Sequence, residues 1–168
     1  MDQDTRLAQA INAPSRAPRQ RMLVNVSSAA LQCYNYPRAA YAASKAGFTN
    51  YLCHIADQIP EEELRIINFH PGAVYTSAAE KAKDVPKDLP IWDHPSLSAH
   101  MAVWLCGKEA GFLHGRFVWA NWCAEELMET REKILGDPAL LKNGVTGCNS
   151  FTVKQLMEKC AEVPVPIS

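Results

Sequence analysis

Tyr41 and Lys45 are the residues whose types and spacing first point to chemistry. They stand four positions apart in a segment with a helical pattern, so their side chains share one helix face, one turn apart. A lysine ammonium beside a phenol favours the phenolate, and such a tyrosine can act as general acid or base towards an alcohol or carbonyl. Ser28, which follows an apolar run, could hold the same substrate oxygen by a hydrogen bond. The Y-x-x-x-K spacing alone is a weak pattern, because a solvated helix surface also produces it.

The elements that must position these residues alternate between strand and helix. The sequence predicts three buried strands, at residues 22–26, 64–70 and 116–120. It predicts helices at 5–12, at 41–58, from Pro95, at 125–135 and from Thr152. In the helix over 41–58, the apolar stripe expected to face the core is Phe48, Tyr51, Leu52 and Ile55. The segment 76–93 shows no clear period.

This alternation is typical of an α/β protein with a parallel sheet and right-handed crossovers. The 168 residues fit one domain. In a sheet ordered 22–26, 64–70, 116–120, the apolar first strand lies at an edge with no charge or proline to prevent further pairing. The sequence therefore predicts a homo-oligomer, or association with a complementary chain.

Four motifs in this order resemble the short-chain dehydrogenase/reductase family. They are NVSS at the end of a strand, a serine thirteen residues before the tyrosine, YAASKAG opening a helix, and a strand that ends in PGAVYT. The resemblance runs from residue 22 to residue 122. It implies that Ser28 positions the substrate oxygen, that Tyr41 transfers the proton, and that Lys45 binds the nicotinamide ribose and supports Tyr41.

The resemblance also implies a cofactor and a reaction. The turn with Pro71, Gly72, Val74 and Thr76 matches the loop that cradles the nicotinamide amide and pyrophosphate, so these residues, with Tyr41 and Lys45, are the expected cofactor-binding set. The cofactor would be NADP or NAD, and the reaction would interconvert an alcohol and a carbonyl in a small-molecule substrate. The segment GRFVWANW resembles the sequences of fungal members of the family that act in secondary metabolism.

The family's nucleotide-binding front end is not recognisable in this sequence. The fold begins with a strand and a glycine-rich turn that places a pyrophosphate at a helix N-terminus, yet no glycine precedes Gly47. We therefore expect the C-terminal part of a Rossmann-type doubly wound sheet, with about three strands, in one truncated domain. Residues 1–21 would be a partial helix and linker, 22–122 the core, and 123–168 a C-terminal helical segment.

Three readings of the function follow from this. Cofactor binding is expected to be weak or absent, and truncation could impair an oxidoreductase. The same three side chains could instead catalyse proton transfer without redox chemistry, as in an isomerase or dehydratase. A pseudoenzyme that binds a full-length relative through the helix over 41–58 is the third reading.

Charge and cysteine content limit the kinds of partner and the cellular compartment that we expect. Seventeen basic and eighteen acidic residues give a net charge of −1, which provides no basic surface for nucleic acid or an anionic membrane. The six cysteines form no C-x-x-C, and no histidine pair has metal-ligand spacing. We expect no metal, free thiols and a cytoplasmic protein, since residues 1–21 lack the apolar run of a signal peptide.

Several neighbours of the motifs have more ordinary interpretations. Ser27 is expected to face the helix layer, Ser44 to be structural, and His70 to be a satisfied core or pocket-wall histidine. Tyr34 and Tyr36 could line a substrate pocket or simply pack within their loop. The four tryptophans are expected to serve packing; they are Trp92, Trp104, Trp119 and Trp122.

Overall fold

Three parallel strands form one sheet in a computed structural model that describes residues 20–33, 37–82, 85–144 and 158. The strands are β1 (Met22–Val26), β2 (Arg65–His70) and β3 (Phe117–Trp119). Their order is β1–β2–β3, with Val24 opposite Ile67 and Phe69 opposite Val118. The α/β class, the strand order and the edge position of β1 are as the sequence predicted.

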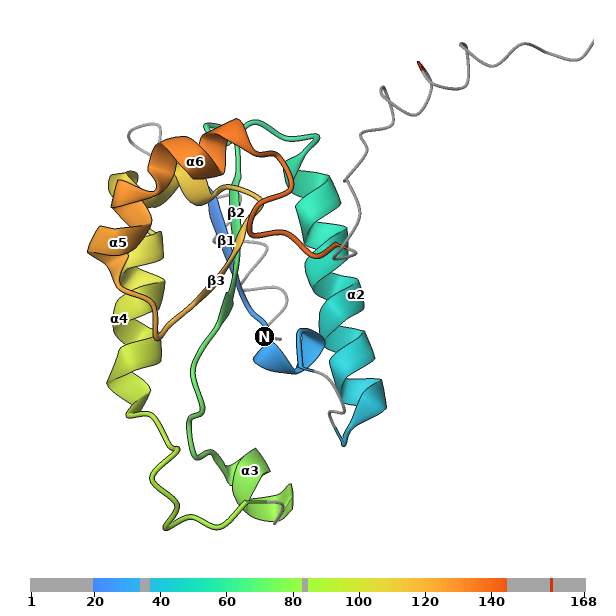
Figure 1. The fold of residues 1–168 in the computed structure, drawn as a ribbon, viewed down its shortest axis with the longest axis vertical. Coiled ribbons are helices and arrows are strands. Elements are labelled where there is room, and N and C mark those ends of the chain that lie inside the picture. Colours follow the sequence, from blue (N-terminus) through green and yellow to red (C-terminus); the bar gives the residue numbers. More distant parts are fainter. Residues whose placement is uncertain (1–19, 34–36, 83–84, 145–157, 159–168) are drawn as a thin grey trace, which may run out of the picture.

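Helices cover both faces of this sheet (Figure 1). They are α2 (Ala39–Ala56), α3 (Ser77–Ala82), α4 (Pro95–Leu105), α5 (Ala124–Glu129) and α6 (Arg131–Gly136), with 3-10 turns η1 (Ala29–Leu31) and η2 (Lys108–Leu113). The alanine-rich start of α2 favours helix, and Pro95 occupies the first helical position of α4, where its missing N–H costs nothing. The helix predicted at 5–12 lies outside the described residues, as do most of the expected N-terminal linker and, except for Glu158, the helix predicted from Thr152.

The core has two layers, one on each face of the sheet. On one face Ile66 packs against Leu52 and Ala56 of α2. Ile67 and Phe69, which point the other way, belong to the cluster built with α4, η2, α5 and α6. The connection from β1 to β2 through α2 and the connection from β2 to β3 through α4 step in the same direction along the sheet. Because their helices lie on opposite faces, the two crossovers have opposite hands. The expectation of right-handed crossovers throughout is wrong for one of the two connections.

The inward face of α2 differs from the predicted stripe. Leu52 is buried, but Phe48 and Tyr51 are 52% and 58% exposed. The fully buried line contains Thr49 and Cys53 instead. The prediction from hydropathy placed the aromatic side chains on the inward face. In the structure, small and polar residues of α2 face the sheet instead.

Two further segments depart from the prediction. The single helix expected over 125–135 is interrupted at Thr130, whose hydroxyl donates to the carbonyl of Leu127, so that α5 and α6 are separate. The segment without a clear period contains the short helix α3, which begins after Thr76. In the described part of the chain, no helix is both long and apolar enough to cross a membrane.

The two edges of the sheet differ in how far other parts of the chain cover them. At β3 the N–H of Phe117 donates to the carbonyl of Leu141 at 2.7 Å, which covers part of that edge. The neighbouring Arg116 guanidinium donates to four backbone carbonyls at and after the end of α6, one of them Ile134 O at 3.1 Å. No strand among the described residues pairs with the outer edge of β1.

Candidate active site

The candidate residues gather where the parallel strands end. Ser28 lies two residues after β1, His70 closes β2, and the Pro71–Gly72 turn follows directly. In open α/β sheets, ligands bind outside these carboxyl ends. The architecture therefore brings two separate sequence motifs to the carboxyl end of the sheet.

Lys45 ties helix α2 to the end of β1. Its Nζ donates to the carbonyl oxygen of Val26 at 3.1 Å and lies 5.8 Å from the centre of the Tyr41 ring. Tyr41, in the first turn of α2, is 40% exposed. The structure thus places the ammonium beside the phenol, as the spacing predicted, and leaves the ring accessible to a ligand.

Ser28 is oriented by the short helix that follows it. Its Oγ accepts a hydrogen bond from the N–H of Ala30 at 3.1 Å and so caps η1. A hydroxyl that accepts one hydrogen bond keeps its own proton for donation, so Ser28 can still donate to a substrate oxygen. The adjacent Ser27 points the other way, into the helix layer, where its Oγ lies 2.7 Å from Thr49 Oγ1. This confirms the predicted orientation of Ser27.

The predicted cofactor turn starts at the end of β2 and is held by Asp93. Gly72 has a φ of +88°, which favours glycine. The next N–H, of Ala73, donates to Asp93 Oδ2 at 2.7 Å, and Val74 forms a parallel bridge with Asp93. Thr76 is exposed, and its Oγ1 accepts from the N–H of Ala79 at 3.3 Å at the start of α3.

His70 lies between the Ser28 segment and the cofactor turn. Its Nδ1 accepts from the N–H of Ala29 at 3.2 Å, and its ring meets Trp119 edge-on with centroids 4.7 Å apart. Burial lowers the pKa of His70, against a smaller opposing effect of the Asp93 charge. The imidazole is therefore neutral at pH 7 with its proton on Nε2. It is a satisfied, half-buried histidine, as predicted.

The remaining neighbours also match their ordinary interpretations. Ser44 Oγ donates to the Tyr41 carbonyl at 2.7 Å. Trp119 donates to Gln32 Oε1 at 2.9 Å and stacks with Trp122 at 6.4 Å. Trp92 packs edge-on against Tyr75. Tyr34 and Tyr36 lie outside the described residues.

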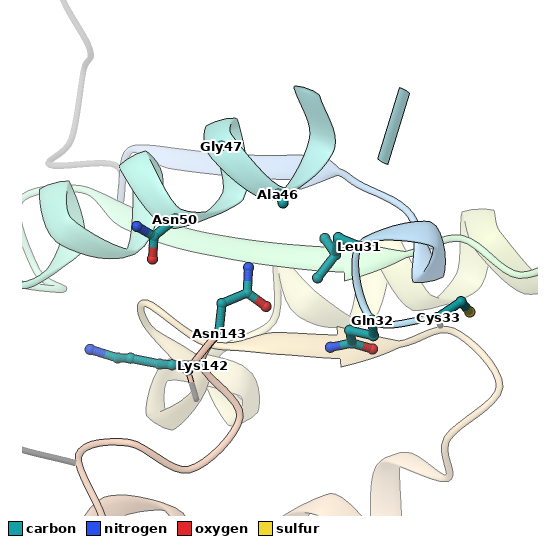
Figure 2. A pocket seen from close by; sticks show the side chains of 9 residues that line it. Leu31, Gln32, Cys33, Ala46, Gly47, Asn50, Lys142 and Asn143 are labelled. Carbon is teal, nitrogen blue, oxygen red and sulfur yellow. The ribbon is translucent and has the colours of Figure 1, made fainter. Parts of the chain in front are cut away.

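A separate cavity of about 730 Å³ lies beside α2 (Figure 2). Its walls are η1 and the residues after it, the middle of α2, and the segment that follows α6. The lining side chains are Leu31, Gln32, Cys33, Ala46, Asn50, Lys142 and Asn143, with Gly47 and Gly144. None of the residues predicted to be catalytic or to bind the cofactor lines it.

The sequence did not predict the roles of Asp93 and Asn121, whose side chains connect the loops of the site. Asp93 accepts from Ala73 and also from Asn121 Nδ2 at 3.0 Å. These partners are 20 and 28 positions away in sequence, so no local spacing reveals them. The only signal was an aspartate two residues before Pro95, in a segment with the composition of a helix start.

Metal ligands and thiol pairs do not add to the site. Among the described residues no group of three or more histidine, cysteine or acidic side chains could hold a metal ion. Four cysteines are free thiols in the described ranges: Cys33, Cys53, Cys106 and Cys123. Burial raises the pKa of the Cys53 thiol, which makes it less reactive. Cys148 and Cys160 lie outside these ranges.

The sequence is similar to a known family and to several curated fungal proteins. The family model described as short chain dehydrogenase matches residues 8–86. Short chain dehydrogenase/reductase nsrO of Aspergillus novofumigatus is 41% identical over 139 residues, which are 80% of this chain and 47% of that protein. AacuD of Aspergillus aculeatus, with the same description, is 39% identical over 125 residues, 74% of this chain and 43% of its own length. The chain spans about half the length of the curated relatives it matches.

Solved structures share the fold at low sequence identity. A 7α-hydroxysteroid dehydrogenase complexed with NADH and 7-oxo-glycochenodeoxycholic acid superposes with a TM-score of 0.50 at 23% identity, over 58% of this chain and 42% of that chain. A variant of actinorhodin polyketide ketoreductase with NADPH gives a TM-score of 0.51 at 20% identity, over 60% and 48%. These likenesses confirm the Rossmann-type arrangement of the sheet.

Proposed function

The chain belongs to the short-chain dehydrogenase/reductase family, and we propose that it interconverts an alcohol and a carbonyl with a nicotinamide dinucleotide. The observation that carries this proposal is the position of Lys45, which contacts both the end of β1 and the Tyr41 ring. Lys45 thus links the helix that bears Tyr41 to the strand end that precedes Ser28. In this proposal Tyr41 is the proton donor and Ser28 is the hydrogen-bond donor for one substrate oxygen, at the carboxyl end of the sheet where ligands bind in open α/β folds.

In the reducing direction, the side chains act on the carbonyl oxygen. Ser28 Oγ–H donates a hydrogen bond that orients this oxygen and stabilises the negative charge that develops on it. Tyr41 gives its phenolic proton to the same oxygen, and the Lys45 ammonium stabilises the phenolate that remains. A nicotinamide dinucleotide held by Lys45 and the turn from Pro71 to Thr76 would supply the hydride to the carbonyl carbon. In the oxidising direction, the Tyr41 phenolate takes the proton back.

The residues present fit the nicotinamide end of the cofactor. The turn from Pro71 to Thr76 begins at the carboxyl end of β2, with Gly72 in a backbone conformation that presents its peptide groups without a side chain. Lys45, on the neighbouring element, would hold the ribose. We further propose that the cofactor is NADP or NAD, as the family resemblance implies. We also propose a role in fungal secondary metabolism, which rests on the resemblance and on the fungal origin of the relatives.

Non-redox proton transfer is the second candidate function. Ser28, Tyr41 and Lys45 could move a proton at a carbon next to a carbonyl, as an isomerase or dehydratase requires. The observation that favours it is the 40% exposure of the Tyr41 ring, which makes the phenol accessible whether or not a cofactor occupies the turn. Turnover that continues after all nicotinamide dinucleotide has been removed would distinguish this reaction from the first.

The test of cofactor use is a titration of the 168-residue chain with NADH and, separately, NADPH, followed by amide chemical shifts. We expect shifts at residues 72–76 and a dissociation constant of about 1 mM, equivalent to about 4 kcal/mol. We expect weak binding because, among the described residues, we assign only Lys45 and the turn to the cofactor, at its nicotinamide end. Lys45→Met should weaken it further, whereas Lys133→Met, an exposed lysine on α6, should not. Micromolar binding would contradict the expected weakness, and no binding at all would contradict the proposed function.

A further inference from the structure

Asp93 occupies a junction between three segments at the carboxyl end of the sheet. One carboxylate oxygen, Oδ2, accepts the N–H of Ala73 at 2.7 Å. The other, Oδ1, accepts the side-chain amide of Asn121 at 3.0 Å. Ala73 lies in the turn after β2, Asn121 lies just after β3, and Asp93 itself precedes α4. One side chain therefore joins the ends of two strands to the start of a helix.

The backbone of Asp93 reinforces this junction. Its N–H donates to the carbonyl of Ala73 at 2.8 Å, so the two residues exchange a backbone and a side-chain hydrogen bond. The pair continues into the parallel bridge between Val74 and Asp93. A carboxylate suits this position because it only accepts hydrogen bonds and can serve two donors at once. Bonds to an ionised acceptor are also stronger than neutral ones.

Gly72 shows how closely the carboxylate approaches the turn. A Cβ added to Gly72 would lie 2.6 Å from Asp93 Oδ2 and 3.2 Å from Asp93 Cγ. Together with the positive φ, this contact leaves room for glycine alone. The shape of the turn is thus fixed jointly by the missing side chain and by the carboxylate that fills its place.

We propose that Asp93 is a positioning residue that holds the turn from Pro71 to Thr76 in the conformation that receives the nicotinamide end of the cofactor. This inference rests on the proposed function, because it concerns the same turn. Asp93 itself would act through the backbone of Gly72 and Ala73. It sets the orientation of peptide groups that would otherwise sample several conformations, and a preorganised turn binds more tightly than one that must be ordered on binding.

The test compares two substitutions of Asp93. In Asp93→Ala both acceptors are lost, and we expect hydrogen exchange at the Ala73 amide to become at least about tenfold faster and the dissociation constant for NADPH to rise about tenfold, each about 1.4 kcal/mol. In Asp93→Asn the amide oxygen can still accept from Ala73, and Asn121 can turn its own oxygen towards the new NH2 group. That variant should stay within about threefold of the unmutated chain in both measurements.

A swap variant and a surface control complete the design. Asp93→Asn combined with Asn121→Asp restores one donor and one acceptor between the two side chains, so it should behave like the unmutated chain. Asn121→Asp alone places two carboxylates against each other and should resemble Asp93→Ala. Asp88→Ala, in the same exposed segment, should change neither measurement. Circular dichroism and the thermal midpoint check that every variant is folded.

The outcomes separate this inference from the proposed function. Unchanged Ala73 exchange in Asp93→Ala would overturn the inference alone, and so would faster exchange with an unchanged dissociation constant. An unmutated chain that binds neither NADH nor NADPH would overturn the proposed function and the inference with it. Faster exchange and weaker binding in Asp93→Ala, both rescued in the swap variant, would support the positioning role.

Discussion

The Tyr41 ring lies on the exposed side of the first turn of α2, so its hydroxyl can be removed without disturbing the core. If the proposed chemistry is correct, Tyr41→Phe should lower turnover by about a hundredfold to ten-thousandfold, the usual effect of removing a well-placed proton donor. Steady-state kinetics measures this. Tyr51→Phe is the matched control, since that ring is also exposed on α2. Normal turnover in Tyr41→Phe would end the proposed role of this residue.

His70 gives the folded protein a dependence on pH. Because burial lowers its pKa in the folded state, the unfolded chain binds more protons than the folded one once the pH falls below about 6.5. This contribution to the free energy of unfolding is therefore present above that pH and is lost as the solution becomes more acidic. Urea denaturation between pH 8 and pH 5 should show a shallower decline in His70→Gln than in the unmutated chain. Identical declines would show that His70 does not titrate differently on folding.

Sequence spacing placed Tyr41 and Lys45 together, but it did not identify Asp93, which joins the loops around them. Tyr41 and Lys45 are neighbours by helix geometry alone, so their spacing was sufficient to place them together. Ser28 was distinguished from Ser27 by its distance from Tyr41 in the sequence, and the structure explains the difference by the contact of Ser27 with Thr49. Asp93 could not be found in this way, because its partners meet it only when three elements have folded together.

At the level of elements, the hydroxyl pair between Ser27 and Thr49 fixes α2 against β1. The two oxygens are 2.7 Å apart, and both side chains are buried, with 3% and 0% exposed. Thr49→Val keeps the shape and leaves the Ser27 hydroxyl without its partner. We expect a loss of about 1–3 kcal/mol in the free energy of unfolding, measured by chemical denaturation.

A double substitution tests the same contact more strictly. Ser27→Ala with Thr49→Val removes both hydroxyls, so no buried polar group is left unpaired and the total loss should be smaller than the sum of the single losses. Additive losses would mean that the two hydroxyls do not stabilise each other.

The same contact explains why the face of α2 was predicted only in part. Thr49 is polar in the sequence yet fully buried, because Ser27 satisfies it. Phe48 and Tyr51 are apolar in the sequence yet exposed, so hydrophobic periodicity placed the inward stripe on the wrong flank. The strands were easier to predict, since residues buried on both faces form continuous apolar runs. The opposite hands of the two crossovers follow from packing that a linear pattern does not contain.

For the whole molecule, the open edge of β1 and the aromatic surface of α2 both favour association. Backbone groups on the outer side of β1 have no strand partner among the described residues, and Val26 at its end is 52% exposed. Phe48 and Tyr51 stack at 6.4 Å on the exposed side of α2. Val24 is a poor place to introduce a charge, because it packs against the core on the α4 side of the sheet.

We therefore predict that the 168-residue chain forms a dimer or larger species at micromolar concentration, with sedimentation velocity as the measurement. Phe48→Glu combined with Tyr51→Glu should shift it towards monomer, because two carboxylates replace the apolar contact without entering the core. Val26→Lys should act in the same direction through the strand edge. Val103→Glu is the control, since Val103 is 73% exposed on α4 across the sheet and should leave the association unchanged. A clean monomer for the unmutated chain would contradict this prediction. Equal effects of the three variants would point to charge alone rather than to a defined interface.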